Sequence, residues 1–199
     1  MTSSIVVHTR EILVHPKEEW RVIDSEPASI RDLLRTYIAP LAAIGPIAAI
    51  IGFSLFGIAM PFVGRYRVPF GSALAQGLVR YVLAVASVFV LALIIDALAP
   101  TFGGQRNRIQ ALKVAAYAST AAWLAGIFMI IPALAILGVL GLYSLYLLYL
   151  GLPVLMKAPE QKAFGYTAVV VVCAMVLFMV VGWIAGSFVT APGAVFPGA

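Results

Sequence analysis

Five long apolar runs constrain this chain more than any other feature, and the short stretches between them hold nearly all of its basic residues. A membrane-spanning helix needs about 20 predominantly apolar residues. The runs predict spans at about residues 37–62, 80–99, 111–131, 133–156 and 166–190. We therefore expect an all-α integral membrane protein with five transmembrane helices in one bundle.

The composition favours a bilayer environment over water. Hydrophobic residues make up 63% of the chain and charged residues 11%, whereas a soluble domain carries about 25% charged residues. The net charge of +5 does not indicate nucleic-acid binding, because the basic residues flank the apolar runs, where they set membrane topology. The single cysteine, Cys173, excludes a disulfide within the chain.

The middle of the chain predicts a helical hairpin. The 43 residues 114–156 carry no charge. One helix of that length would extend about 65 Å, which is twice the thickness of the hydrocarbon core. Two helices that turn near Pro132 fit the bilayer.

The placement of lysine and arginine predicts the orientation. Ten of them fall in residues 1–36, the second-to-third connection and the fourth-to-fifth connection, and three fall on the other side. Cytoplasmic loops carry the excess of basic residues. We expect a cytoplasmic segment 1–36 with no cleavable signal peptide, a membrane domain 37–190 and an external tail 191–199, in a bacterial inner membrane.

The segment before the first span predicts two short helices. Pro16 suits the first position of the second helix, and Trp20 and Ile23 would share one face of it. Either helix could lie on the membrane surface or pack beneath the bundle. An ordered entry segment and a partner-binding arm are both compatible with the pattern.

Short motifs ahead of and between the spans give the chain a family resemblance. They are Pro16-Lys17-Glu18-Glu19-Trp20 with Ile23, Phe102-Gly103-Gly104, Ala111-Leu112-Lys113 with Ala116-Tyr117, and Tyr143-Ser144-Leu145-Tyr146-Leu147-Leu148 leading to Gly151-Leu152-Pro153. In their order and position the chain resembles the Ypt-interacting protein (Yip) family of five-span membrane proteins, in its prokaryotic branch. The resemblance covers about residues 11–183.

The resemblance implies the five-span fold and leaves the activity open. Eukaryotic relatives act in vesicle traffic with small Rab-type GTPases. They carry an acidic Asp-Leu-Tyr-Gly-Pro element before the spans, which residues 1–40 lack. The trafficking role is therefore not carried over to this chain.

Two charged residues of the second span are candidate functional groups. Asp96 lies about one turn inside the span, and an acid at membrane depth marks a functional site by default. The alternative is a headgroup-level pairing of Asp96 with Lys113, Arg106 or Arg108. For Arg80, at the other end of the span, snorkelling to headgroups is the alternative to lining a polar pathway.

Polar and small residues in the later spans suggest how the helices pack. Tyr143 and Tyr146 follow one side of the fourth span, and the Tyr143 hydroxyl needs a partner, for which we expect Ser119, Thr120 or a carbonyl of the third span. Small residues permit close helix approach; those predicted at interfaces are Ala118, Ala122, Gly126, Gly182 and Gly186. For Gly182 and Gly186 the contact could be intramolecular or a homodimer interface.

Catalytic, cofactor-binding and metal-binding residues are not predicted. Phe102-Gly103-Gly104 reads as a turn, because no Gly-Lys-Ser/Thr follows it. His8 and His15 lack a nearby third ligand type, so surface histidines of the tail are the better interpretation.

The sequence therefore predicts a non-enzymatic, membrane-organising or partner-binding protein. Its partners would be membrane lipids and other membrane proteins, with a homo-oligomer as a further possibility. The alternative is a small transporter, channel or lipid-moving protein with a polar route near Asp96.

Overall fold

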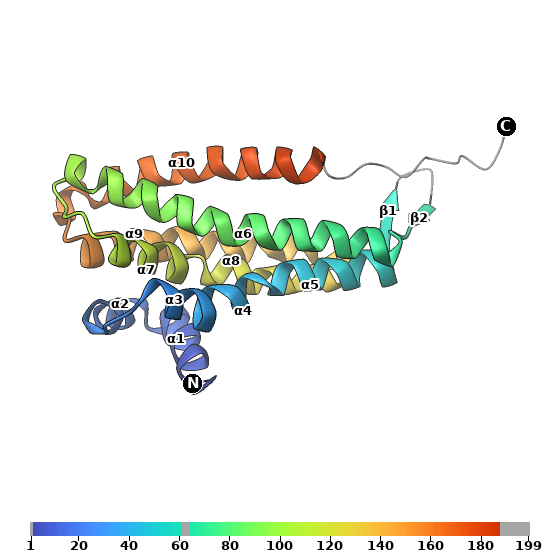
Figure 1. Ribbon diagram of the computed structural model, residues 1–199, viewed down its shortest axis with the longest axis horizontal. Helices are drawn as coiled ribbons and strands as arrows, with labels where there is room; N and C mark the ends of the chain where they lie inside the picture. The colour runs from blue at the N-terminus through green and yellow to red at the C-terminus, as the bar shows by residue number, and fades with distance from the viewer. Residues whose placement is uncertain (1, 61–63, 188–199) are drawn as a thin grey trace.

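The protein folds into an elongated helical bundle with a short helical pair against its side (Figure 1). The computed structural model describes residues 2–60 and 64–187, with the backbone alone for 2–4, 58–60, 64–66 and 187. Among these residues, five helical segments are long and apolar enough to cross a membrane: Ile30–Phe56, Phe70–Phe102, Arg108–Ile130, Pro132–Met156 and Glu160–Gly186. The predicted all-α, five-span fold class is confirmed.

The N-terminal segment forms two helices, α1 (Thr2–Val14) and α2 (Pro16–Ser25). Pro16 occupies the first turn of α2, where its missing N–H costs nothing because that group has no partner inside a helix. The next helix begins after Ser29, whose hydroxyl accepts a hydrogen bond from the Asp32 backbone N–H. This cap fixes the point at which the chain enters the bundle.

The first spanning segment is built from five short helical pieces. They are α3 (Ile30–Leu33), the π-helix η1 (Leu34–Ile38), α4 (Ala39–Ala42), α5 (Ile44–Ile51) and the π-helix η2 (Gly52–Phe56). Pro40 and Pro46 cannot donate a backbone hydrogen bond, which disturbs the regular ladder. The helix ends at Phe56 because Gly57 takes a positive φ of 70°.

A two-stranded antiparallel hairpin follows, with β1 (Ile58–Met60) paired to β2 (Gly64–Tyr66). The apolar run predicted as the first span is therefore not helical to its end. The second segment, α6 (Phe70–Leu98), begins well before Arg80, the predicted start of the second span. Helix ends do not mark the membrane boundary, so the predicted domain limits remain predictions.

The remaining elements complete the bundle. They are η3 (Ala99–Phe102), α7 (Arg108–Ala118), α8 (Thr120–Ala125), the 3-10 helices η4 (Gly126–Ile130) and η5 (Pro132–Leu142), α9 (Tyr143–Met156) and α10 (Glu160–Ser187). The chain leaves helical geometry at Ile131, beside Pro132. The predicted external tail 191–199 lies outside the described residues, which end at residue 187.

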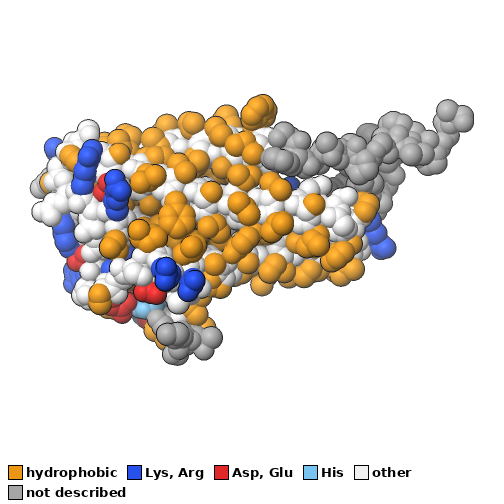
Figure 2. All heavy atoms as spheres, viewed as in Figure 1, with side chains coloured by type: hydrophobic (Ala, Val, Ile, Leu, Met, Phe, Trp, Pro, Cys, Tyr) orange, Lys and Arg blue, Asp and Glu red, His pale blue; other side chains and the backbone are white. Residues whose placement is uncertain are grey.

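The two ends of the bundle differ in chemistry. At one end, here called the tail end, α2 lies beside the connections 103–107 and 157–159: Gln105 N–H donates to Met156 O at 2.8 Å, and Lys157 contacts Asp24. The opposite end, here called the far end, carries β1, β2 and Ile131. Charged side chains gather at the tail end, while apolar side chains cover the length of the bundle (Figure 2).

Burial is uneven across the segments. Half of the most apolar window of Arg108–Ile130 is buried, against 6% of the corresponding window of Glu160–Gly186. The small side chains of α7 permit close packing against both α6 and α9. The third segment therefore lies at the centre of the bundle, and α10 lies at its edge.

Candidate functional site: the junction of the tail with the bundle

Trp20 anchors the N-terminal helices to the bundle. Its side chain is fully buried, with its ring edge-on to Tyr117 at a centroid distance of 6.3 Å. A Cβ atom added at Gly151 of α9 would lie only 2.6 Å from the indole Cζ2 atom. The indole thus occupies space that any residue other than glycine at position 151 would fill.

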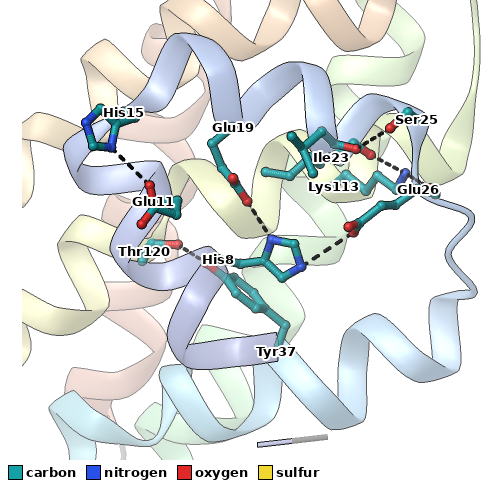
Figure 3. Close-up of polar contacts among 11 residues, drawn as sticks. His8, Glu11, His15, Glu19, Ile23, Ser25, Glu26, Tyr37, Lys113 and Thr120 are labelled. Atoms are coloured by element: carbon teal, nitrogen blue, oxygen red, sulfur yellow. Dashed lines mark hydrogen bonds and ion pairs between the residues drawn. The ribbon is translucent and has the colours of Figure 1, made fainter. Parts of the chain in front are cut away.

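The C-terminal end of α2 is held by side chains of α7. The buried Lys113 ammonium donates to Ile23 O at 2.7 Å and to Glu26 O at 2.5 Å (Figure 3). The last carbonyls of a helix have no partner inside the helix and carry partial negative charge. Lys113 therefore caps α2, and its buried positive charge lies against the partly negative C-terminal end of that helix.

Asp24 adds two further contacts at the same place. Gln110 Nε2 donates to Asp24 Oδ1 at 2.9 Å, and the Lys157 ammonium lies 2.5 Å from Asp24 Oδ2. Lys157 belongs to the connection between α9 and α10, so one aspartate of the tail joins two parts of the bundle. The exposed Lys157 pair contributes little by itself.

His8 links α1 to α2 through two carboxylates. Its Nδ1 atom lies 2.5 Å from Glu19 Oε1, and its Nε2 atom lies 3.4 Å from Glu26 Oε2 (Figure 3). The His8 side chain is 13% exposed, so the expectation of a free surface histidine was wrong here. His15 pairs instead with Glu11 at 3.0 Å, on the exposed side of the tail.

Two tyrosine hydroxyls complete the junction. Tyr37 shares a hydrogen bond of 2.7 Å with Thr120, and Tyr143 donates to Leu13 O of α1 at 3.1 Å. The expected partner of Tyr143 in the third span was therefore wrong. Its hydroxyl reaches the tail, while Thr120 is already paired with Tyr37.

Tyr146 lies beside Tyr143, with ring centroids 5.5 Å apart. It is 42% exposed, and it adds no hydrogen bond to the junction among the described residues. Of the two tyrosines named from the sequence, Tyr143 belongs to the junction.

The Phe102-Gly103-Gly104 turn is present and belongs to the tail end. Gly103 has a positive φ of 76°, and a Cβ at Gly104 would lie 2.7 Å from Met156 O. Phe102 stacks on Tyr166 at 5.0 Å, and the Tyr166 hydroxyl donates to the Ile95 carbonyl. This turn holds the connection 103–107 against the end of α9.

The residues that carry the family resemblance thus converge in space. Pro16 is buried at the start of α2, while Trp20, Tyr117 and Gly151 pack together and Pro153 lies two residues further along α9. Sequence order alone could not show that these motifs meet.

Asp96 is not in the junction. Among the described residues it has no ion pair, and its Oδ1 atom is buried without a hydrogen-bond partner. The suggested pairing with Lys113 is not found, because Lys113 binds the tail carbonyls instead. Asp96 lies next to Ile95, the acceptor for Tyr166.

Arg80 lies within α6, away from the tail end, and lines an open groove of about 450 Å³ between α6, α8 and α10. The guanidinium sits 6.0 Å from the Phe53 ring centroid. Ser87 and Ser119 also line the groove, and each hydroxyl donates to a carbonyl of its own helix.

The small residues predicted at interfaces divide into two groups. Ala118 is buried, Ala122 meets Gly141 of η5, and Gly126 meets Gly45 of α5. Gly182 and Gly186 have no described atom within 4 Å of an added Cβ, so the intramolecular packing suggested for them is not found. Both line the groove beside Arg80.

Sequence reasoning missed several residues of the junction. The sequence pattern predicted His8 to be a surface residue, and it did not identify Tyr37, Gln110 or Asp24 as members of a site. A lysine followed by 43 uncharged residues was a usable signal, because a buried ammonium requires acceptors close by. Nothing in the sequence identified those acceptors as the end of α2.

The side chains of the junction attach the tail to the bundle. Among the described residues, no group of three or more His, Cys, Asp or Glu side chains is placed to hold a metal ion. The polar groups of the junction instead join the tail to α7 and α9, and the Tyr37–Thr120 bond joins the first spanning segment to α8. The arrangement can hold the tail in one position and present its outer face.

The fold and this junction define a class: an all-α, five-helix membrane protein whose N-terminal helical pair is packed against its spans. A family model, the Yip1 domain, matches residues 10–182, so the chain belongs to the Yip family, as the sequence motifs predict. Members of this family are generally non-enzymatic membrane proteins that interact with other proteins and with membranes. No curated protein and no solved structure matches the chain.

Proposed function

We propose that this protein is a non-enzymatic membrane-organising or partner-binding protein that presents a folded N-terminal tail to its partners. The observation that carries this proposal is the junction itself, in which Trp20, Lys113 and Tyr143 hold the tail to α7 and α9. A tail held so firmly offers a rigid surface. Preorganised surfaces lose less entropy on binding than mobile ones do.

The outer face of α2 is the part of the tail that meets a partner in this proposal. Lys17, Glu18, Arg21 and Val22 are exposed there, while Trp20 and Ile23 on the other face are buried. A short helix with one anchored face and one mixed polar face suits binding to another membrane protein at the headgroup level. A homo-oligomer through this face is one form of the same proposal.

We infer that the tail end faces the cytoplasm of a bacterial inner membrane, with the C-terminus outside. The support is the distribution of basic residues, ten against three, together with the grouping of the tail and both basic connections at one end. Lysine and arginine near membrane segments favour the cytoplasmic side. A reporter fused after Ala199 that is active only in the periplasm supports this orientation, and cytoplasmic activity contradicts it.

Photocrosslinking from living membranes tests partner binding. A photoreactive amino acid replaces Arg21 on the outer face of α2, and the matched control replaces Trp183, which is 77% exposed on α10. A discrete protein adduct at Arg21 that is absent at Trp183 supports the proposal. Adducts of equal yield at both positions, or at neither, contradict a tail-specific partner.

A small transporter, channel or lipid-moving protein is the second candidate. The observation that favours it is the buried Oδ1 atom of Asp96, which lacks a hydrogen-bond partner, because unpaired acids in membranes often serve transport. Purified protein in liposomes provides the test. If Asp96→Asn and Arg80→Gln each abolish a flux that the native protein supports, the transport function replaces the partner-binding one.

A further inference from the structure

The groove between α6 and α10 is a separate feature from the junction. It lies toward the far end, where α10 runs alongside α6 (Figure 1), and its lining residues include Arg80, Leu91, Leu177 and Gly186. Its volume of about 450 Å³ falls within the usual range of about 300–1,000 Å³ for ligand pockets. Phe178, which is 60% exposed, forms part of the lining, so the groove opens toward the surroundings of the bundle.

The lining is mostly apolar, and its polar side chains include Arg80, Ser87 and Ser119. The Ser87 and Ser119 hydroxyls donate to carbonyls of their own helices, at 2.8 and 2.7 Å. They therefore offer little to a polar ligand. A water-filled conduction path would need polar groups along its length, so this groove suits an apolar occupant.

The groove has the length of one membrane leaflet. From Arg80 to Leu91 the helix rises about 16 Å, and half of the hydrocarbon core is about 15 Å. On the other wall, α10 is 28 residues long, or about 42 Å, which exceeds the core thickness. In this proposal the last turn of α10, which contains Gly186, lies near the headgroup level on the far side, and Arg80 lines the same groove.

Arg80 gives the groove a charged end. Among the described residues its guanidinium has no carboxylate partner, and it lies 6.0 Å from the centroid of the Phe53 ring. A contact with a ring face leaves the five N–H donors available for hydrogen bonds. The guanidinium fork matches phosphate oxygens in both charge and shape.

We propose that this groove binds one phospholipid of the far leaflet, with an acyl chain between α6 and α10 and its phosphate on Arg80. Gly182 and Gly186 leave room for the chain, since nothing described lies within 4 Å of a Cβ added at either position. This site stands apart from the proposed function, because it shares no residue with the junction.

A photoactivatable lipid tests the site. Full-length protein is reconstituted in phosphatidylethanolamine–phosphatidylglycerol vesicles that contain phosphatidylglycerol with a diazirine on its acyl chain. After irradiation, peptide mass spectrometry is expected to find adducts concentrated on residues 84–91 and 174–186. Arg80→Gln should lower their yield about fivefold, the effect of one basic residue near the membrane surface, and Arg80→Lys should retain most of it.

Two further variants address the acyl chain. Gly182→Phe adds a Cβ that meets no described atom within 4 Å and places its ring in the groove, so it should abolish the adducts while the protein remains folded by circular dichroism. Met179→Phe, at a position that is 74% exposed on the same helix and not in the groove lining, should leave the yield unchanged. Arg67→Gln, an exposed arginine outside the groove, should also have no effect.

Three results would overturn the proposal. Adducts spread evenly along α10 would show ordinary lipid contact. A yield that is the same for native protein, Arg80→Gln and Gly182→Phe would show that neither the charge nor the groove selects lipid. Conversion of a dimer to a monomer by Gly182→Phe, with lipid adducts unchanged, would assign the groove to a second copy of the chain.

Discussion

Replacing Gly151 by alanine should release the tail from the bundle. The added Cβ would lie 2.6, 2.8 and 2.9 Å from three atoms of the Trp20 indole, whereas carbon atoms in ordinary contact are about 3.5–4.0 Å apart. The ring would have to shift by about 1 Å within a fully buried site. Such overpacking costs about 1–3 kcal/mol, which raises the population of the detached tail roughly 5- to 150-fold.

Trypsin cleavage at Arg21 measures that population. Arg21 lies within α2, so cleavage requires the helix to open, and its rate follows the open fraction when opening is fast. The fragment is quantified by mass spectrometry in lipid nanodiscs. Gly71→Ala is the matched control, because an added Cβ there meets nothing within 4 Å.

A double variant makes the test specific to the indole. Trp20→Phe removes the ring atoms that the new Cβ would strike, so Gly151→Ala should cost less in the Trp20→Phe background than in the native one. Contacting residues show such coupling, whereas independent sites are additive. If the effects of the two substitutions are strictly additive, or if Gly151→Ala leaves the cleavage rate unchanged, the packing of Trp20 against Gly151 is refuted.

Two other changes test the remaining contacts of the junction. Lys113→Met removes two hydrogen bonds from a charged donor, each worth about 1.5–3 kcal/mol, so cleavage at Arg21 should rise at least tenfold; Lys162→Met, at an exposed position, should not change it. Tyr37→Phe leaves the buried Thr120 hydroxyl without its partner and should lower stability by about 1–3 kcal/mol, measured by thermal unfolding in detergent. Tyr146→Phe is the control for it, and equal losses in both would contradict the assigned role of the Tyr37 hydroxyl.

The spanning architecture was predictable because it depends on local properties of the chain. The length and composition of an apolar run decide whether it can cross the bilayer, and neighbouring residues contain that information. The turn at Phe102-Gly103-Gly104 was predictable for the same reason, since Gly103 permits the positive φ that the turn requires.

The junction was not predictable because its contacts join residues far apart in the sequence. Tyr143 was expected to bond within the neighbouring helix, yet it bonds to Leu13, 130 positions away. Lys113 was considered as a partner for Asp96, but the end of α2 offers it two carbonyls. Which face of a short helix meets a bundle depends on the whole packing arrangement, and a periodic pattern alone does not specify it.

For Gly182 and Gly186 the sequence pattern suggested a packing contact that the described structure does not contain. Their spacing is typical of close helix packing, but α10 lies at the edge of the bundle and the described structure leaves both glycines open. The glycine spacing shows that another helix or a lipid chain could approach this face of α10 closely. It does not show which of them does.

Hydrogen–deuterium exchange of the native protein in lipid nanodiscs tests most directly whether the tail is a packed part of the bundle. α2 has only 10 residues, and an isolated helix of that length is marginal in water, so protection of its amides requires attachment. We expect the amides of residues 20–25 to exchange at least about tenfold more slowly than unstructured peptide amides, because opening exposes a Trp20 side chain whose burial is worth about 1.5–3 kcal/mol. Exchange of these amides at the rate of an unstructured peptide would contradict the account.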